Sequence, residues 1–284
     1  FTATWYPDTT DIRFQQCLET ITLAHANKIP LVIIDASPPP VHAALQNTTA
    51  IVHPQTNNRG GGKGGALREA ADLAAARPNV DDDTFLFWTE PEKTQMASLF
   101  RSVYDRCEDG DDIVVPYRNH ERFRCCYPVE QYHSETFGNF YLDTVMNDAL
   151  SSSSSSTPQN VSGPGTCRSA CLSDPAFENE KLVTERSGQT IPVVDWHFGP
   201  FGFRKRHLSL WTEYSGRSYD AQLVPIVHGM RKGLRVRSIL VAFELSGRMK
   251  EQEEGNVEFI EKRLKQLWDL DPVVKKAWSD EYYC

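Results

Sequence analysis

The sequence predicts an α/β fold with a mostly parallel sheet flanked by helices. Apolar runs of strand length alternate with segments of helical periodicity through the first 116 residues. Leu31-Val32-Ile33-Ile34 is unbroken and apolar, as expected of a parallel strand that helices cover on both faces. Strand, helix and strand in repetition is the pattern of a sheet with right-handed crossovers. Ligands of such sheets bind beyond the carboxyl ends of the strands.

The expected elements of the first half follow in order. Strands are predicted over residues 2–6, 31–34, 50–53, 85–88 and 113–116. Between them, apolar residues recur at helical spacing from Phe14 to Ala24 and from Met96 to Cys107, and an alanine-rich helix runs to Arg77. Residues 117–141 are dense in arginine and aromatic residues, which favours an irregular packed excursion over an acceptor-binding wall.

The second half contains a linker-like stretch and further helical segments. Residues 151–166 are rich in Ser, Pro and Gly, which predicts a mobile loop because this composition cannot build a core. A helix starting near Asp220 leads to a strand over 239–243. Residues 254–284 predict C-terminal helices with a break at Asp271-Pro272, packed across the sheet or forming a homodimer contact. No chemistry is visible in that tail.

Composition excludes several classes of function. A net charge of -8 leaves no global field to attract nucleic acid, so an anionic ligand needs a local cationic site. No apolar run approaches the roughly 18–20 residues of a transmembrane helix. The seven cysteines show no paired C-x-x-C spacing, which argues against a zinc site. Cys167 and Cys171 could pair with each other, or with Cys125 or Cys126, in an oxidising compartment, so localisation stays open.

The stretch from Asn58 to Arg68 is the strongest motif in the chain. Five glycines in six positions, Gly60 to Gly65, surround Lys63. Glycines let backbone N–H groups converge on an anion near a helix N-terminus, and Lys63 and Arg68 add positive charge. This chemistry suits a phosphate; a flexible surface loop is the alternative.

Two common phosphate motifs do not fit this stretch. A P-loop needs Ser or Thr directly after the lysine, where Gly64 stands, and a dinucleotide-binding fingerprint needs its glycines after the first strand. The run Gly62-Lys63-Gly64-Gly65-Ala66-Leu67-Arg68 instead resembles the Asn-x-Gly-Lys-Gly-Gly-Ala-x-Arg signature of dolichyl-phosphate glucosyltransferases and their relatives. That resemblance implies a Rossmann-like fold of glycosyltransferase A type within the nucleotide-diphospho-sugar transferase superfamily.

The resemblance also implies a donor site along the strand ends. Pro7 ends the first strand, and Asp35 ends the second, where the family contacts the base or ribose. Gly62, Lys63, Gly64 and Arg68 would lie near the nucleotide and phosphates of a UDP- or GDP-sugar. Gly199 or Gly202 with Arg204 and Arg206 is similar to a Gly-x-x-x-x-Arg-Arg segment that closes the donor site.

Glu90-Pro91-Glu92 occupies the place of the family's Asp-x-Asp motif. The resemblance implies that Glu92, with Glu90, holds Mn²⁺ or Mg²⁺ against the diphosphate, and that His197 is the histidine recruited from the second half. Carboxylates suit such cations, but glutamate is longer than aspartate and Pro91 stiffens the turn. The alternative is that both glutamates begin the next helix.

Asp220 is the candidate catalytic base. In inverting members of the family, an aspartate at this helix start takes the proton of the acceptor hydroxyl, and Asp195 is the reserve candidate. A helix N-cap is the alternative role for Asp220.

Taken together, the sequence predicts one glycosyltransferase domain over residues 1–284. Residues 1–116 would bind the nucleotide-sugar, and residues 190–250 would form the half that binds a hydroxyl acceptor. A sugar nucleotidyltransferase ranks second. Those enzymes place their glycine-rich loop after the first strand, and this chain has no glycines between Thr4 and Asp8. A noncatalytic binding protein on a transferase scaffold ranks third, because Glu replaces Asp at the metal position.

Overall fold

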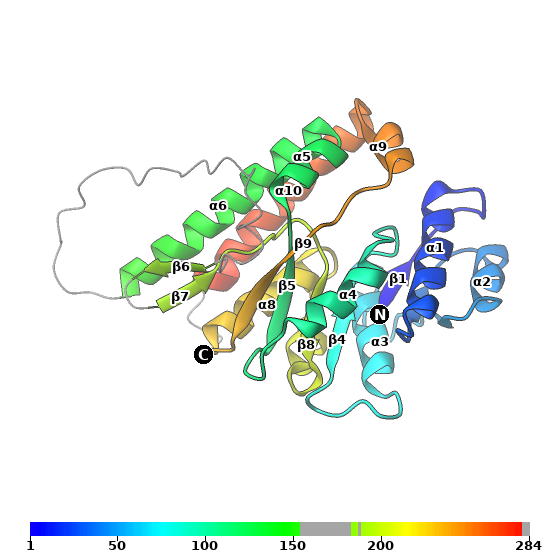
Figure 1. Cartoon of the computed structure of the whole chain (residues 1–284), viewed down its shortest axis with the longest axis horizontal. Coiled ribbons are helices and arrows are strands. Elements are labelled where there is room, and N and C mark those ends of the chain that lie inside the picture. Colours follow the sequence, from blue (N-terminus) through cyan, green and yellow to red (C-terminus); the bar gives the residue numbers. More distant parts are fainter. Residues whose placement is uncertain (154–182, 187–188, 280–284) are drawn as a thin grey trace.

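A three-stranded and a four-stranded sheet lie edge to edge at the centre of the molecule (Figure 1). The structure is a computed structural model that describes residues 1–153, 183–186 and 189–279. The three-stranded sheet is parallel and consists of β1 (Thr2–Thr4), β2 (Val32–Asp35) and β3 (Ile51–Pro54). Thr4 pairs with Asp35 and Asp35 with Pro54, so the carboxyl ends of these strands are level.

The four-stranded sheet contains an antiparallel strand. Its order is β4 (Phe85–Trp88), β8 (Phe201–Arg204), β5 (Ile113–Arg118) and β9 (Val236–Val241). β8 is antiparallel to both β4 and β5, whereas β5 and β9 are parallel. β4 and β5 therefore run in the same direction.

Hydrogen bonds between β1 and β4 join the two sheets. The amino group of Phe1 donates to the Phe87 carbonyl at 2.6 Å, and the Thr89 N–H donates to the Phe1 carbonyl at 3.4 Å. Phe1 thus bonds to the residues on either side of Trp88, and this is the hydrogen-bond pattern of two parallel strands. The combined order is β3-β2-β1-β4-β8-β5-β9, which confirms the predicted α/β fold with a mostly parallel sheet. β6 (Val183–Arg186) and β7 (Gln189–Pro192) form a separate antiparallel pair.

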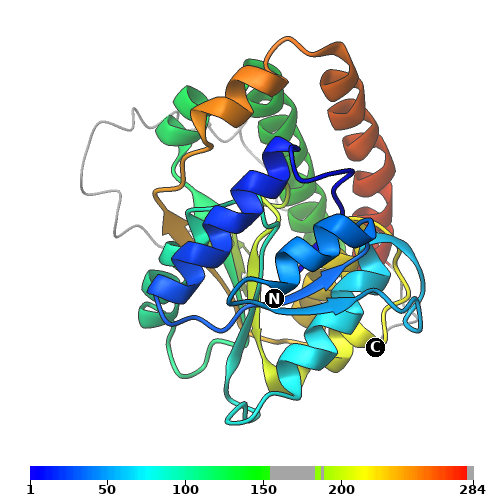
Figure 2. The same cartoon turned by 90° about the vertical axis from the view of Figure 1, so that its right-hand side faces the viewer.

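Helices cover both faces of the sheet (Figure 2). Their bounds are α1 Ile12–Ala26, α2 Pro39–Gln46, α3 Gly62–Ala75, α4 Met96–Asp105, α5 His120–Cys126, α6 Val129–Ser153, α7 Ser209–Thr212, α8 Asp220–Arg231, α9 Gly247–Glu253 and α10 Val257–Ser279. A 3₁₀ turn at Lys205–His207 precedes α7. No helix in the described part of the chain is long and apolar enough to cross a membrane.

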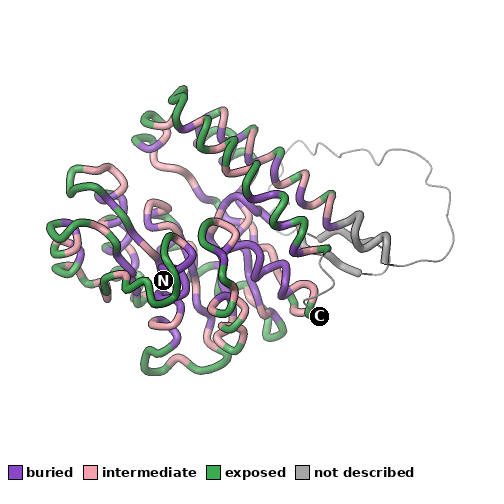
Figure 3. The backbone as a smooth tube through the Cα atoms, turned by 180° about the vertical axis from the view of Figure 1, so that it is seen from behind, coloured by how far each residue is buried: buried purple, intermediate pink, exposed green. Residues whose placement is uncertain are grey.

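The unbroken apolar run of β2 serves two cores. Ile33 packs with α1 residues such as Phe14 and Cys17, whereas Val32 and Ile34 belong to the cluster that contains the alanine face of α3. Successive strand residues point to opposite faces, so a strand buried on both faces must be apolar throughout. Figure 3 shows the buried residues along the central strands.

The structure corrects several expectations for the segments after β5. Residues 117–141 form the end of β5, α5 and most of α6 instead of an irregular excursion. Residues 151–153 end α6, and the rest of the predicted loop 151–166 lies outside the described residues. α10 continues through Pro272, because buried Leu270 and Val274 hold both halves against the molecule. α10 packs on α6 and α8 (Figure 1), and the dimer contact stays a prediction.

Candidate functional site

A cavity of about 430 Å³ lies beyond the carboxyl ends of β1 and β4. One side consists of the residues that follow these strands and the first turn of α3. α8 contributes Tyr219 and Gln222 from the start of that helix. α9 and α10 supply the opposite side with Glu253, Lys262 and Gln266, among others. Of the predicted site residues, Gly62, Lys63, Glu90, Glu92 and His197 line this one cavity.

The glycines of the predicted phosphate motif permit close backbone contacts. A Cβ on Gly64 would lie 2.1 Å from the Gly216 carbonyl oxygen, and a Cβ on Gly65 would lie 1.6 Å from that of Gly60. The Gly64 N–H donates to the Arg217 carbonyl at 3.0 Å, so a segment of the chain, rather than an open space, accepts this hydrogen bond. The glycine run therefore packs the start of α3 against the segment before α8.

Arg68 lies outside the cavity lining and binds backbone carbonyls. Its Nη1 donates to the carbonyls of Tyr214 and Gly216 at 2.7 Å each, and its Nε and Nη2 donate to that of Arg59. The residue is 4 % exposed. Arg68 thus fixes the two loops that the glycines bring together, and of the two predicted phosphate-binding cations only Lys63 lines the cavity.

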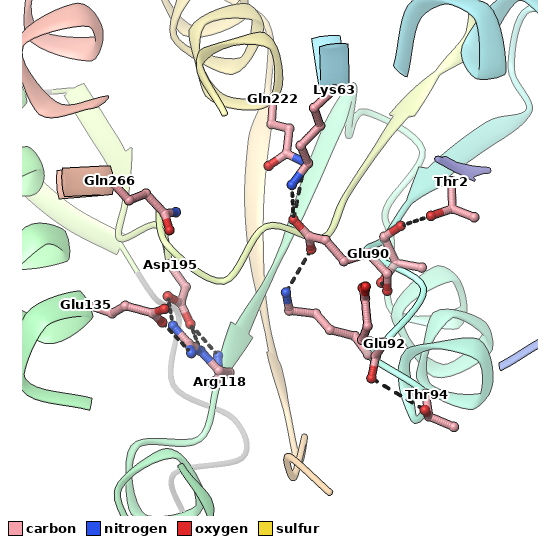
Figure 4. Close-up of polar contacts among 12 residues, drawn as sticks. Thr2, Lys63, Glu90, Glu92, Thr94, Arg118, Glu135, Asp195, Gln222 and Gln266 are labelled. Carbon is pink, nitrogen blue, oxygen red and sulfur yellow. Dashed lines mark hydrogen bonds and ion pairs between the residues drawn. The ribbon is translucent and has the colours of Figure 1, made fainter. Parts of the chain in front are cut away.

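Lys63, Glu90 and Lys93 form a chain of ion pairs inside the cavity. Lys63 Nζ lies 2.9 Å from Glu90 Oε1, and Lys93 Nζ lies 2.8 Å from Glu90 Oε2. Gln222 Nε2 also donates to Glu90 Oε1, at 3.3 Å. Figure 4 shows Lys63 and Gln222 both turned toward Glu90. Burial alone would raise the pKa of Glu90, but the two ammonium groups bring it far below its usual range.

The Lys63 ammonium is protonated at neutral pH. Burial lowers its pKa, but the Glu90 carboxylate and Tyr219 outweigh this effect and leave the pKa above its usual value. The Tyr219 ring centroid lies 3.9 Å from Lys63 Nζ, which is cation–π geometry. Lys63 is therefore a fixed positive charge with the Tyr219 ring and the Glu90 carboxylate as its neighbours.

Glu92 differs from Glu90, although it is two residues away and lines the same cavity. No side chain in the described part of the chain forms an ion pair or hydrogen bond with its carboxylate, which interacts with its own backbone N–H. Burial raises the pKa of Glu92, and the neighbouring Glu90 charge raises it further. A carboxylate with a raised pKa and no side-chain partner can accept a proton from a bound ligand.

Asp35 and Pro7 do not line the cavity. The Asp35 side chain is fully buried. Its Oδ1 accepts from the hydroxyls of Thr4 at 2.7 Å and Ser37 at 2.6 Å, and its Oδ2 lies 2.8 Å from His42 Nδ1. Asp35 therefore ties the ends of β1 and β2 together, and its neighbours Thr4 and Ala36 reach the cavity instead. Pro7 lies in a separate, open hollow beside α9.

The residues present do not fit a metal site built on both glutamates and His197. Both Glu90 oxygens already contact ammonium groups. His197 Nε2 lies 3.6 Å from Asp271 Oδ1 of α10. In the described part of the chain, no three or more His, Cys, Asp and Glu side chains form a group that could hold a metal ion.

Asp220 begins α8 as predicted but is not among the cavity residues. Its Oδ1 accepts from the Ser218 N–H at 2.8 Å, and its Oδ2 accepts from the Tyr214 hydroxyl at 3.1 Å. These contacts fix the loop that enters α8. The reserve candidate Asp195 is buried against Arg118.

Comparison with known proteins finds similarity among solved structures. No family model matches the chain, and no curated protein matches it in sequence. One of these is described as CMP:2-keto-3-deoxy-manno-octonic acid synthetase complexed with CTP. It is 10% identical, the match covers 95% of this chain and 98% of that one, and the TM-score is 0.43.

A buried ionic cluster lies on the α6 side of the cavity. Arg118 donates from Nε and Nη2 to Asp195 at 2.7 Å each, and its Nη1 lies 2.8 Å from Glu135 Oε2. Figure 4 shows Arg118 between these two carboxylates. Arg263 of α10 joins the cluster at 3.2 Å from Glu135 Oε1. The cluster connects β5 and α6 to α10, which closes the cavity.

Sequence reasoning missed the contribution of α10. Lys262, Arg263 and Gln266 line the cavity from a helix in which the sequence shows no chemistry. The sequence analysis also assigns no role to Lys93, although a lysine three residues after Glu90 is a local signal for an ion pair. The α10 residues carry no such local signal, because only the fold brings them opposite the strand ends.

Proposed function

We propose that this protein is a glycosyltransferase that moves a sugar from a nucleoside-diphosphate sugar to a hydroxyl acceptor. One observation carries the proposal: two fixed ammonium groups, Lys63 and Lys93, share a cavity with the carboxylate of Glu92, which has no side-chain partner among the described residues. Cations beside a carboxylate match the two charges of the reaction, which are a leaving diphosphate and a hydroxyl that loses its proton.

The remaining lining suits a sugar. Trp5 and Tyr219 offer aromatic surface, and Gln266 of α10 offers an amide group. Sugars combine apolar faces with many hydroxyl groups, so a mixed aromatic and amide lining complements them. In this proposal, the diphosphate lies at the α3 side and the acceptor enters beside α10.

In the proposed transfer, one bond to the sugar carbon breaks and another forms. The bond between the sugar carbon and the diphosphate oxygen breaks, and its electron pair stays on that oxygen beside Lys63 and Lys93. The acceptor oxygen forms the new bond to the sugar carbon. Its proton passes to a carboxylate, which later releases it to water.

We infer that Glu92, rather than Asp220, is that proton acceptor. Glu92 faces the cavity with no side-chain partner among the described residues, whereas the Asp220 carboxylate accepts hydrogen bonds from Ser218 and Tyr214 and does not line it. Glu92→Gln should keep donor binding and reduce turnover by about 100-fold or more, as expected for loss of a general base. Asp220→Asn should keep most of the turnover; the reverse result would assign the role to Asp220.

A sugar nucleotidyltransferase is the second candidate. The same two lysines would serve a nucleoside triphosphate equally well, and the similar solved structure is that of a synthetase complexed with CTP. The two functions differ in product. Chromatography of nucleotides after incubation with UDP- and GDP-sugars and a mixture of small hydroxyl acceptors should show free UDP or GDP. Pyrophosphate released from a nucleoside triphosphate and a sugar phosphate would support the second candidate. Absence of both free nucleoside diphosphate and pyrophosphate would support a binding protein.

A further inference from the structure

The sequence motif Glu90-Pro91-Glu92 resembles a metal-binding motif, but the structure gives Glu90 a different set of neighbours. Each Glu90 oxygen contacts one ammonium group, Lys63 at 2.9 Å and Lys93 at 2.8 Å. With one carboxylate and two ammonium groups, this trio carries a net charge of +1. The trio is well enclosed, since the three side chains are 26 %, 17 % and 20 % exposed for Lys63, Glu90 and Lys93.

The fold holds Glu90 in this position from the opposite side. Gly199 has a φ of 97°, and a Cβ there would lie 2.6 Å from Glu90 Oε2. A side chain at position 199 would therefore push the carboxylate away from Lys93. Gln222 fixes the other oxygen with a hydrogen bond from its amide at 3.3 Å.

A divalent cation on Glu90 would have to displace the two ammonium groups or lie against them. Like charges at this spacing repel strongly where water is largely excluded. Glu92 alone cannot replace the lost ligand, because His197 faces Asp271 and no described group of three or more His, Cys, Asp and Glu could hold a metal ion.

We propose that Lys63 and Lys93, held apart by Glu90, bind the diphosphate of the donor and take the place of a divalent metal ion. An ammonium group has three N–H donors, and Glu90 accepts from only one on each lysine. The others can donate to phosphate oxygens. Two lysines on one carboxylate thus supply a preorganised cation of fixed geometry, which stabilises the charge that builds up on the departing diphosphate.

This inference rests on the proposed function for the identity of the ligand, but its test does not need turnover. Binding of inorganic pyrophosphate is measured by isothermal titration calorimetry on the full chain, first with EDTA and then with Mn²⁺. Wild type should bind pyrophosphate in EDTA. Mn²⁺ should not increase the affinity once the binding of Mn²⁺ to free pyrophosphate is taken into account. Lys63→Met and Lys93→Met should each weaken binding by about tenfold or more, the loss of one charge-assisted hydrogen bond.

Two variants control for folding and for net charge. Lys275→Met removes the same charge from an exposed position of α10 that does not line the cavity, and should bind as wild type. Lys93→Arg keeps the charge and should retain more affinity than Lys93→Met; circular dichroism checks that every variant is folded. Binding that requires Mn²⁺, binding unchanged in both Met variants, or no binding in either condition would each overturn the proposal.

The inference and the proposed function can fail separately. Pyrophosphate binding in EDTA that depends on both lysines, without transfer from any UDP- or GDP-sugar, would support the lysine site and refute the transferase. Transfer that strictly requires Mn²⁺ would support the transferase and overturn the lysine site.

Discussion

Lys63 and Glu90 are 27 residues apart in sequence, and their side chains meet at 2.9 Å inside the cavity. Lys63 comes from the first turn of α3, and Glu90 from the segment directly after β4. The pair thus connects the glycine-rich segment to the strand end where a donor would lie. Because Lys93 shares the same carboxylate, the charge of Glu90 holds two cations in place.

Glu90→Gln should destabilise the folded protein. The substitution removes the anion between Lys63 and Lys93, so two partly buried ammonium groups are left to repel each other. Loss of one partner of a buried pair costs roughly 3–5 kcal/mol, and partial exposure here reduces the expectation to about 2 kcal/mol of unfolding free energy. Urea denaturation at pH 7 measures it.

Lys265 and Asp269 provide the matched control for this prediction. They form an exposed ion pair on α10, so Asp269→Asn should cost less than about 1 kcal/mol. Equal effects of the two substitutions would show that the Lys63–Glu90–Lys93 trio is no stronger than a surface pair. Combining Glu90→Gln with Lys93→Met should recover part of the loss, because one of the repelling charges is gone.

Gly64→Ala should be strongly destabilising, although alanine favours helices. Its Cβ would lie 2.1 Å from the Gly216 carbonyl oxygen, which is backbone and cannot rotate away. Overpacking of this kind costs about 1–3 kcal/mol, and the shift would also move Lys63. Thermal and urea denaturation test this, with Gly247→Ala as the control: a Cβ there meets nothing within 4 Å. Wild-type stability of Gly64→Ala would contradict the close packing of α3 on the loop before α8.

Patterns that are local in sequence predicted the fold well. Phe85–Trp88 was predicted with its observed bounds, since an apolar run of four residues between polar residues has the length of a buried strand rather than of a helix. The helix that starts at Asp220 was also confirmed. The prediction of an irregular excursion over residues 117–141 was wrong, because their arginine and aromatic residues show no helical periodicity that would have indicated α5 and α6. Arg118 can be buried because it pairs with Asp195, which is 77 residues away in sequence, and no local pattern indicates that pairing.

The candidate site was predictable only in part, for the same reason. The sequence places Lys63, Glu90 and Glu92 at one rim because each follows an expected strand end, and the cavity contains all three. The sequence could not distinguish the roles of the two glutamates, which depend on Lys93 and on the space left by Gly199. Residues such as Lys262 and Gln266 join the site only when α10 packs across the cavity.

Arg118→Met should be among the most destabilising substitutions in the chain. It leaves the carboxylates of Asp195 and Glu135 buried without their main partner, since each side chain is 3 % exposed. Unpaired buried charge costs about 3–5 kcal/mol. Guanidinium denaturation measures the loss. Arg101→Met, which breaks the exposed pair with Asp105, should cost less than about 1 kcal/mol. A loss of that small size in Arg118→Met would mean that water reaches the ionic cluster.

Glu92→Gln should make the protein more stable at neutral pH. Burial, with the Glu90 charge, raises the pKa of Glu92 in the folded state above its unfolded value of about 4.3. The stabilising contribution of the protonated carboxyl is therefore full below the unfolded pKa and is lost as pH rises through the folded pKa. Above the unfolded pKa, burial of the Glu92 carboxyl therefore costs stability, and glutamine removes this cost because it does not ionise.

The pH profile separates this effect from a simple packing change. Thermal denaturation between pH 4 and pH 8 should give Glu92→Gln a higher melting temperature at pH 7, by about a few degrees, and a difference that disappears toward pH 4. Glu261→Gln, at an exposed position of α10, should follow wild type throughout. A variant no more stable than wild type at pH 7 would contradict the raised pKa. Higher stability together with lost turnover is the trade-off expected of a residue retained for chemistry, because its charge costs stability.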